Sequence, residues 1–293
     1  MRVFVAVAEA AGFAAAARRL GMSAPAVTRA VAELEQRIGT RLLQRTTRIV
    51  RVTDAGTRYL ADCRRILAEV AEAEASAAGA HAEPRGQLAV TASVMFGRMF
   101  VAPVILDFLA RYPEVAVRFV LLDRIADLVE EGLDVAVRIA HLPDSALSAV
   151  KVGAVRRVVC ASPEYLARHG TPRRPADLRA FDAVSFSPMP ATEEWSFAHG
   201  AESETVRPPT RFIVNNTDVA VAAAAAGRGF VRALSYQIAP ELSAGRLKIV
   251  LEDFEPPPLP IHIVHAEGRR ASARVRAFVD FAVERLRAEK SLN

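Results

Sequence analysis

Short polar and basic side chains near the N-terminus recur at a spacing that suits a polyanionic partner. Pro25, Thr28 and Arg29 fall on one side of a helical segment. The apolar residues of that segment form the opposite stripe, at spacings of four, three and four: Val27, Val31, Leu34 and Ile38. A short, partly basic face at the start of a helix is suited to base edges in the DNA major groove. A three-helix bundle that binds another protein is the alternative interpretation.

A second basic pattern follows immediately. Its arginines punctuate an apolar run and lie at Arg41, Arg45, Arg48 and Arg51. The run predicts two short strands joined by a turn at Thr46 and Thr47. A basic hairpin beside a helix-turn-helix is a wing, which suits contacts to phosphates or to a minor groove.

Residues that could support catalysis or metal binding are sparse. The chain has no GxSxG, HExxH or P-loop motif. Cys63 and Cys160 are too far apart for a metal motif, and we interpret both as small core residues. His262 and His265 lie three apart on an expected strand, so their side chains point to opposite faces. The sequence therefore predicts no catalytic residue, no metal and no cofactor.

The elements that position the basic face form three helices. The first is expected at 2–11 and the second at 13–20, ended by Gly21. Ser23 is expected to cap the third helix, with Pro25 in its first turn. Helix, glycine-containing turn and helix is the helix-turn-helix plan, and we add Ser23 to the candidate DNA-binding residues.

Charge is distributed unevenly along the 293 residues. Residues 1–65 contain 12 arginines and 5 acidic residues, whereas the rest of the chain contains 26 basic and 28 acidic residues. A basic head and a nearly neutral body favour a nucleic-acid partner for the head. No uncharged run approaches the length that spans a bilayer, and we expect a cytoplasmic protein without a membrane partner.

These N-terminal residues carry a resemblance to a known family. The runs RVFVAVAEAAGFAAAARRLGMSAPAVTRAVAELEQRIGTRLLQRTTR and VTDAGTRYL resemble the DNA-binding domain of LysR-type bacterial transcriptional regulators. The resemblance implies contacts to bases or phosphates at the start of the recognition helix and at a wing arginine: Ala24, Pro25, Thr28, Arg29 and Arg48. The family usually has a polar residue, often Gln, where this chain has Ala24.

A long helix is expected to join the head to the body. Thr53 can cap it, and an apolar stripe follows at Leu60, Cys63, Leu67, Val70, Glu74 and Ala77, with Glu74 as the exception. Pairing with a second copy is the simplest way to bury this stripe, and the resemblance implies the same dimerising helix. Packing on the chain's own body is the alternative. We expect a winged helix-turn-helix at 1–53, the linker helix at 54–79 and a hinge at 80–86.

The body alternates strand-like and helical runs, which predicts an α/β domain with a largely parallel sheet. The first runs are 88–92, 99–111, 115–122, 126–131 and 135–139. The later runs are 158–161, 183–186, 212–214, 219–226, 230–234, 261–265 and 273–289. Two α/β lobes with a returning C-terminal segment fit this order. The expected fold class is thus mixed, with an all-α winged head and linker helix followed by an α/β two-lobed domain.

The body also resembles the LysR-type effector domain, through GQLAVTAS, LARYPEV, LVEEGLDVAVRI, RRVVCASPEYLARHGTP and SARVRAFVDFAVERL. That domain is similar to the type II periplasmic-binding-protein fold, which implies a small molecule held between two lobes. We expect the effector domain at 87–293, with lobe I at about 87–159 and 262–293 and lobe II at about 160–261.

Ligands in open α/β sheets sit beyond the carboxyl ends of strands, where helix N-termini favour anions. This rule selects residues after three expected strands as effector-binding candidates: Ser93, Val94, Met95, Phe96, Arg138, Ile139, Asn216 and Thr217. Simple N-capping is an equally good interpretation of Asn216. Arg232 interrupts an apolar strand and needs a partner, which is either an internal acid or an anionic effector.

The sequence therefore predicts a regulator that binds double-stranded promoter DNA as a homodimer or homotetramer. Its effector is a small molecule, with an organic acid as the candidate class. The alternative is a cytoplasmic small-molecule binding protein or enzyme whose N-terminal helices contact another protein.

Overall fold

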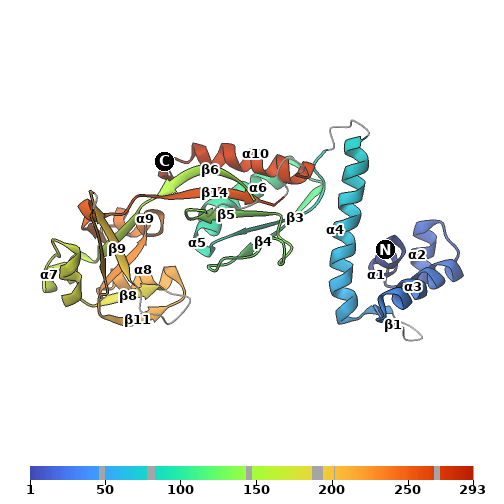
Figure 1. Ribbon diagram of the computed structural model, residues 1–293, viewed down its shortest axis with the longest axis horizontal. Coiled ribbons are helices and arrows are strands. Elements are labelled where there is room, and N and C mark those ends of the chain that lie inside the picture. Colours follow the sequence, from blue (N-terminus) through green and yellow to red (C-terminus); the bar gives the residue numbers. More distant parts are fainter. Residues whose placement is uncertain are drawn as a thin grey trace. The chain divides into compact units, whose positions relative to one another are not determined.

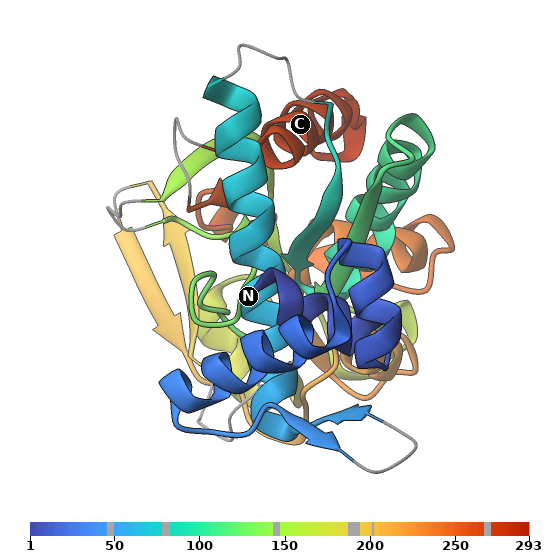
Figure 2. The same cartoon turned by 90° about the vertical axis from the view of Figure 1, so that its right-hand side faces the viewer.

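The computed structural model describes residues 1–45, 50–77, 83–142, 147–186, 194–200, 202–266 and 271–292. Its contacts divide the chain into two compact units, Met1–Glu83 and Pro84–Asn293. We call them the head unit and the effector unit and describe each by itself. Figures 1 and 2 show their elements.

The head unit is built from four helices and a small hairpin. Its elements are α1 (Arg2–Glu9), α2 (Phe13–Leu20), α3 (Ala24–Ile38), β1 (Leu43–Arg45), β2 (Val50–Val52) and α4 (Asp54–Ala77). α2 ends at Gly21, whose positive φ of 62° favours glycine. Ser23 then caps α3, because its Oγ accepts from the Ala26 N–H at 3.4 Å. The helices and the hairpin confirm the expected winged helix-turn-helix.

Two side chains fasten the hairpin to the helices. Glu35 of α3 accepts the N–H groups of Leu42 at 2.8 Å and Leu43 at 2.9 Å. Thr53 caps α4 by accepting the Gly56 N–H at 2.9 Å, and its hydroxyl donates to Arg41 O at 2.9 Å. The hairpin is therefore held at the junction of α3 and α4 (Figure 2).

The start of α4 belongs to the core of the head unit. Cys63 is fully buried in that core, and Leu60 packs against it. The Tyr59 ring lies 5.6 Å from the Phe4 ring of α1. The expectation of one stripe left open for a second copy is thus wrong for Leu60 and Cys63, because α1 already covers that part of α4. Further along, Val70 is 40% exposed.

The effector unit contains two mixed five-stranded sheets. Lobe I has the strand order β4-β3-β5-β14-β6, and lobe II has the order β11-β8-β12-β7-β13. The strands of lobe I are β3 (Gly86–Ala92), β4 (Val115–Leu121), β5 (Val135–Ile139), β6 (Ser148–Val155) and β14 (Leu259–His265). The strands of lobe II are β7 (Arg157–Ala161), β8 (Ala183–Phe186), β11 (Thr210–Val214), β12 (Phe230–Leu234) and β13 (Lys248–Val250).

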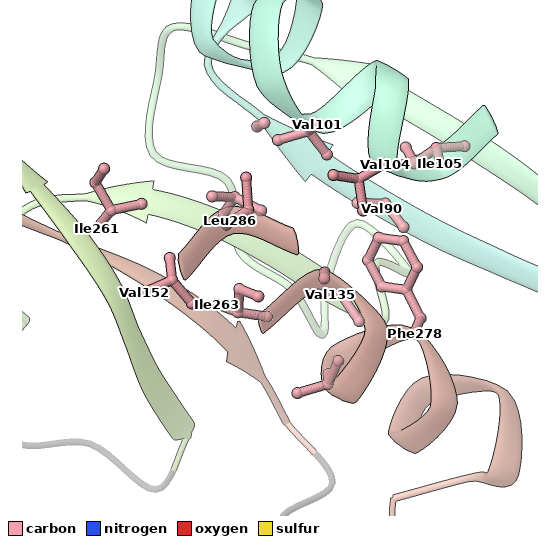
Figure 3. Packing of buried hydrophobic residues seen from close by; sticks show 14 of the residues in the cluster. Val90, Val101, Val104, Ile105, Val135, Val152, Ile261, Ile263, Phe278 and Leu286 are labelled. Carbon is pink, nitrogen blue, oxygen red and sulfur yellow. The ribbon is translucent and has the colours of Figure 1, made fainter. Parts of the chain in front are cut away.

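Helices cover one face of the lobe I sheet. Its helical elements are α5 (Val94–Phe96), the π-helical turn η1 (Gly97–Val101), α6 (Ala102–Arg111), α10 (Ala273–Ala288) and the 3-10 turn η5 (Lys290–Leu292). Figure 3 shows side chains of α6 and α10 meeting side chains of the strands, with Phe278 of α10 close to Val104 and Val90. Phe108 and Phe278 meet edge to face at 5.2 Å, which joins α6 to α10.

Lobe II is covered on both faces. Its remaining elements are α7 (Pro163–His169), the 3-10 turns η2 (Pro175–Ala180) and η3 (Glu252–Phe254), α8 (Thr217–Ala225), α9 (Ser235–Ser243), and the hairpin β9 (Trp195–His199) and β10 (Glu202–Val206). α8 and α9 pack on one face around Val221 and Ile238. Trp195 of the hairpin and Tyr165 of α7 pack on the other face.

The lobes differ from expectation in three respects. The chain crosses at Arg156 and returns before Leu259, so Val158 and Val159 belong to lobe II rather than lobe I. Strand β14 enters lobe I from lobe II and pairs antiparallel with β5 and β6, which makes the sheet mixed rather than largely parallel. Strand β3 begins at Gly86, the last residue assigned to the hinge.

The run 126–131 forms turns rather than the expected helix. Asp127 holds it, because its Oδ1 accepts the N–H groups of Val129 at 2.8 Å and Glu130 at 3.0 Å. This is an N-cap arrangement, and the segment stops after one turn at Gly132, whose φ is positive at 60°. Ala126 and Leu128 still pack on the second face of the lobe I sheet.

The junction of hairpin and helix makes Gly56 intolerant of a side chain. A Cβ there would overlap the Leu42 carbonyl oxygen and lie 2.8 Å from Val52 Cγ1. In an open helix Gly→Ala stabilises by about 1 kcal/mol. We expect Gly56→Ala instead to lower the free energy of unfolding of the head unit by about 1–3 kcal/mol. Hydrogen exchange of the α1 to α4 amides measures this, with the β14 amides as internal control. Stronger protection of the head amides would contradict the prediction.

Candidate DNA and effector sites

The first turns of α3 present the candidate base-contacting residues to solvent. Ser23, Ala24, Pro25 and Arg29 are exposed, and Thr28 is half-buried. Val27 and Val31 are fully buried on the opposite side of the same helix. Burial of one stripe therefore fixes α3 with its polar N-terminal face outward.

The hairpin contributes a second group of arginines beside this face. Arg41 is exposed just before β1, and Arg51 is exposed on β2, paired in register with Gln44. Arg45 ends β1, but its side chain is not described. Arg48 and the expected turn at Thr46 and Thr47 lie outside the described residues.

Some arginines of the head unit are already neutralised. Arg19 donates to Glu9 Oε2 at 2.8 Å, and Arg64 donates to Glu9 Oε1 at 3.2 Å. This carboxylate thereby joins α1 to α2 and α4. Arg29 and Arg41 have no such ion pair among the described residues, so their guanidinium groups are available for phosphates or bases.

In the effector unit, the segment after β3 is occupied by contacts within the protein. The Val94 N–H donates to Asp123 Oδ1 at 3.0 Å. The Ser93 side chain lies close enough to Tyr236 of α9, a residue of lobe II, to lower the pKa of its hydroxyl. Met95 and Phe96 are buried in the lobe I core. Ser93 and Val94 are half-buried at the lobe junction, whereas Met95 and Phe96 support the core.

Tyr236 is the main element of this junction that sequence reasoning missed. Its side chain is only 3% exposed and packs edge-on against Phe96 at 5.3 Å and Phe100 at 5.7 Å. Burial raises the pKa of Tyr236 to about 12, so the hydroxyl stays protonated. Gln237 Nε2 donates to this hydroxyl at 3.3 Å. The sequence signal that could have identified Tyr236 is an aromatic residue that closely follows an expected strand.

Asn216 and Thr217 lie at the start of α8. Asn216 caps the helix, because its Oδ1 accepts the Val219 N–H at 3.0 Å. Thr217 is buried, and Asp218 follows in the first turn. Capping is thus observed for Asn216, and a ligand contact there stays a prediction.

The two arginines that the sequence selected are engaged elsewhere. Arg138 Nη2 donates to Ala126 O at 2.6 Å, which ties β5 to the turn segment. Arg232 Nη2 donates to Glu194 O at 3.2 Å, and its guanidinium lies 5.8 Å from the Trp195 ring centroid. Alternation along β12 places Arg232 on the hairpin face of the sheet, opposite to α8. Ile139 packs against the lobe I core.

A different arginine reaches lobe II from lobe I. Arg98 of η1 donates through Nη2 to Asp218 Oδ1 of α8 at 2.7 Å. Both side chains are accessible, at 61% and 45% exposure. Sequence spacing does not predict this pair, because the two residues are 120 positions apart.

The remaining chemical candidates lie in the core. Cys160 is buried mid-strand in β7, and burial raises its pKa to about 12. Within the described ranges, no three His, Cys, Asp or Glu residues are grouped so that they could hold a metal. No helix in the described part of the chain is long and apolar enough to cross a membrane.

Comparison with protein families matches both units. Residues 1–57 match the family described as "Bacterial regulatory helix-turn-helix protein, lysR family". Residues 81–287 match the "LysR substrate binding domain". The second match alone covers more than half of the chain.

Individual proteins are similar along the whole chain. A transcriptional repressor of Pseudomonas aeruginosa (strain UCBPP-PA14) is 35% identical over 97% of this chain and 90% of its own length. The transcriptional activator AaeR of Escherichia coli (strain K12) is 31% identical over 96% and 91%. The solved structure of CrgA, a LysR-type transcriptional regulator from Neisseria meningitidis, has 31% identity and a TM-score of 0.62, covering 97% of each chain.

The exposed position of Arg29 generates a binding prediction. We expect Arg29→Ala to weaken binding to specific duplex DNA by about 1–3 kcal/mol, because a base contact would be lost. Fluorescence anisotropy measures the affinity. Arg58→Ala, which removes the same charge from an exposed position on α4, is the matched control. Equal losses in the two variants would remove the proposed base contact.

The buried thiols generate a reactivity prediction. Desolvation raises the pKa of both Cys63 and Cys160, so neither forms the reactive thiolate near pH 7. We expect Ellman's reagent to modify neither thiol in the folded protein and both after unfolding in urea. Rapid reaction of Cys160 in the folded state would contradict this and would show that its thiol is not buried in the core.

Proposed function

Because the chain belongs to the LysR family of bacterial transcriptional regulators, we propose that it binds promoter DNA through α3 and the β1–β2 wing. Exposure of the N-terminal face of α3, together with a family match over both units, carries this proposal. The relatives described above are named as regulators, which does not favour an enzyme. They include both a repressor and an activator, so either sign of regulation is compatible with this family.

The DNA-contacting set that we propose is Ser23, Ala24, Pro25, Thr28, Arg29, Arg41, Arg45 and Arg48. Within α3, side chains in the first turns approach base edges, and Ser23 completes the helix start. The wing arginines approach phosphates or a minor groove. Ala24 supplies no hydrogen-bond donor or acceptor from its side chain, so its contact would be apolar.

We propose a homodimer, or a tetramer built from dimers, that pairs through α4. Leu60 and Cys63 are committed to the head core, so the pairing surface has to begin further along the helix. The exposure of Val70 supports a surface there. A dimer would present two recognition helices to two half-sites. The cytoplasm, where bacterial DNA lies, is the proposed location.

The effector unit is proposed to bind a small molecule at the junction of the two lobes, near Ser93, Val94, Asn216 and Thr217. These residues lie on elements that the Arg98–Asp218 and Ser93–Tyr236 contacts bring together. Met95, Phe96 and Ile139 support that region from the core. Arg138 and Arg232 are withdrawn from our proposal as direct contacts, since both are held by other partners. An organic acid is the proposed effector class.

Anisotropy titration against the DNA upstream of the protein's own gene tests the regulator proposal. We expect specific binding over a scrambled duplex, with log K falling by about 0.9 per phosphate contact for each tenfold rise in salt. The alternative, a binding protein whose head contacts only proteins, predicts no salt-dependent DNA binding. Failure of both duplexes to bind at low salt would therefore overturn the proposal.

A further inference from the structure

We propose that Arg98 is the anion-binding side chain of the effector site and that Asp218 is its built-in competitor. A carboxylate effector would replace Asp218 as the partner of the Arg98 guanidinium. This inference rests on the proposed function, because it concerns the same lobe junction. It assigns a specific group to the recognition of an organic acid.

One backbone donor at the start of each of the helices α5 and α8 is already engaged. The Val94 N–H donates to Asp123 at 3.0 Å, and the Val219 N–H donates to Asn216 at 3.0 Å. An effector carboxylate would have to displace an internal acceptor from either group. An arginine side chain adds a full positive charge that these backbone groups lack.

Among the arginines considered for this role, only Arg98 spans the lobes. Arg138 is held by a backbone carbonyl of the turn segment, and Arg232 lies against Trp195 on the other face of lobe II. Arg98 is a residue of η1, which directly follows the segment that contains Ser93 and Val94. Its partner Asp218 directly follows Thr217.

Electrostatic coupling places the pair at the same junction as the buried tyrosine. Asp123 and Asp218 both act on Tyr236 and raise its pKa through their negative charges, after the larger effect of burial. Ser93 acts on the same hydroxyl in the opposite direction and lowers its pKa. The Arg98–Asp218 pair therefore lies near enough to Tyr236 for the Asp218 charge to act on its hydroxyl.

The internal pair is weak enough to be exchanged. The Arg98 and Asp218 side chains are 61% and 45% exposed, so water screens their attraction. Exposed ion pairs of this kind contribute little net stability, and a guanidinium binds carboxylates in general. A solute carboxylate can thus compete with Asp218 without unfolding either lobe.

The test compares variants of the full-length chain by calorimetric titration with acetate, benzoate and succinate. Asp218→Asn keeps the shape of the side chain and removes the competing charge. We expect at least one of these carboxylates to bind Asp218→Asn about threefold to fivefold more tightly than the unaltered protein. Acetamide, benzamide and succinamide, which are the uncharged counterparts, should show no gain.

Two further variants separate a direct role of Arg98 from a general charge effect. Asp107→Asn is the matched control, because Asp107 pairs with exposed Arg285 at 3.2 Å within lobe I, with 56% and 53% exposure. It also removes one negative charge and should leave carboxylate binding unchanged. In Arg98→Gln/Asp218→Asn, the gain produced by Asp218→Asn should disappear.

Three results would overturn the inference. These are no gain in Asp218→Asn over Asp107→Asn for all three carboxylates, an equal gain for the amides, or a gain that persists without Arg98. DNA binding by the same preparations distinguishes this failure from failure of the regulator proposal. A protein that binds its operator, but in which Arg98 does not affect carboxylate binding, retains the proposed function and loses only this assignment.

Discussion

Tyr236 is a side chain of one lobe that is buried in the core of the other, and the arrangement of the effector unit depends on it. Its ring completes an aromatic cluster with Phe96 and Phe100, while its hydroxyl meets Ser93 and Gln237. Burying a ring requires close packing, whereas burying a hydroxyl requires partners. The two requirements together allow few relative positions of α9 and the segment after β3. The lobes therefore meet through a shared core and not only through the two connecting segments.

Around this shared core, the polar groups are satisfied internally. Asp123, Asn216 and Tyr236 each occupy a donor or hydroxyl that a ligand could otherwise use. A ligand then acts by exchange, because it has to offer a better partner than the one already present. Exposed contacts are exchanged at lower cost than buried ones, and this favours the Arg98–Asp218 pair over the hydroxyl network as the point of entry.

The head and its charge could be predicted from the sequence because both depend on local rules. Helix periodicity, Gly21 and the cap at Ser23 indicated α1 to α3 and the outward face of α3. Most strands of the body followed from apolar runs in the same way. Burial of Cys63 in a core was predicted, but the element that covers it was not, because helix periodicity cannot say which partner covers a stripe. The 126–131 run was expected to be a helix because its apolar pattern does not show that Gly132 ends it after one turn. The roles of Arg98, Asp218 and Tyr236 were not predicted, because their contacts join positions that are distant in the sequence. Residue spacing does not show which distant positions lie close together in the fold.

The shared burial of Tyr59, Leu60 and Cys63 with α1 has a mechanical meaning. The first turns of α4 and the recognition helix are parts of one rigid body, since rotating one against the other would open the core around Phe4. Helix α4 thus extends rigidly from the part of the head unit that contains the recognition helix. If two copies pair along the outer part of α4, a small change in the angle between the two α4 helices would move each α3 as well. The separation of two half-sites on DNA would then be set by the geometry of two stiff rods rather than by flexible joints at the head.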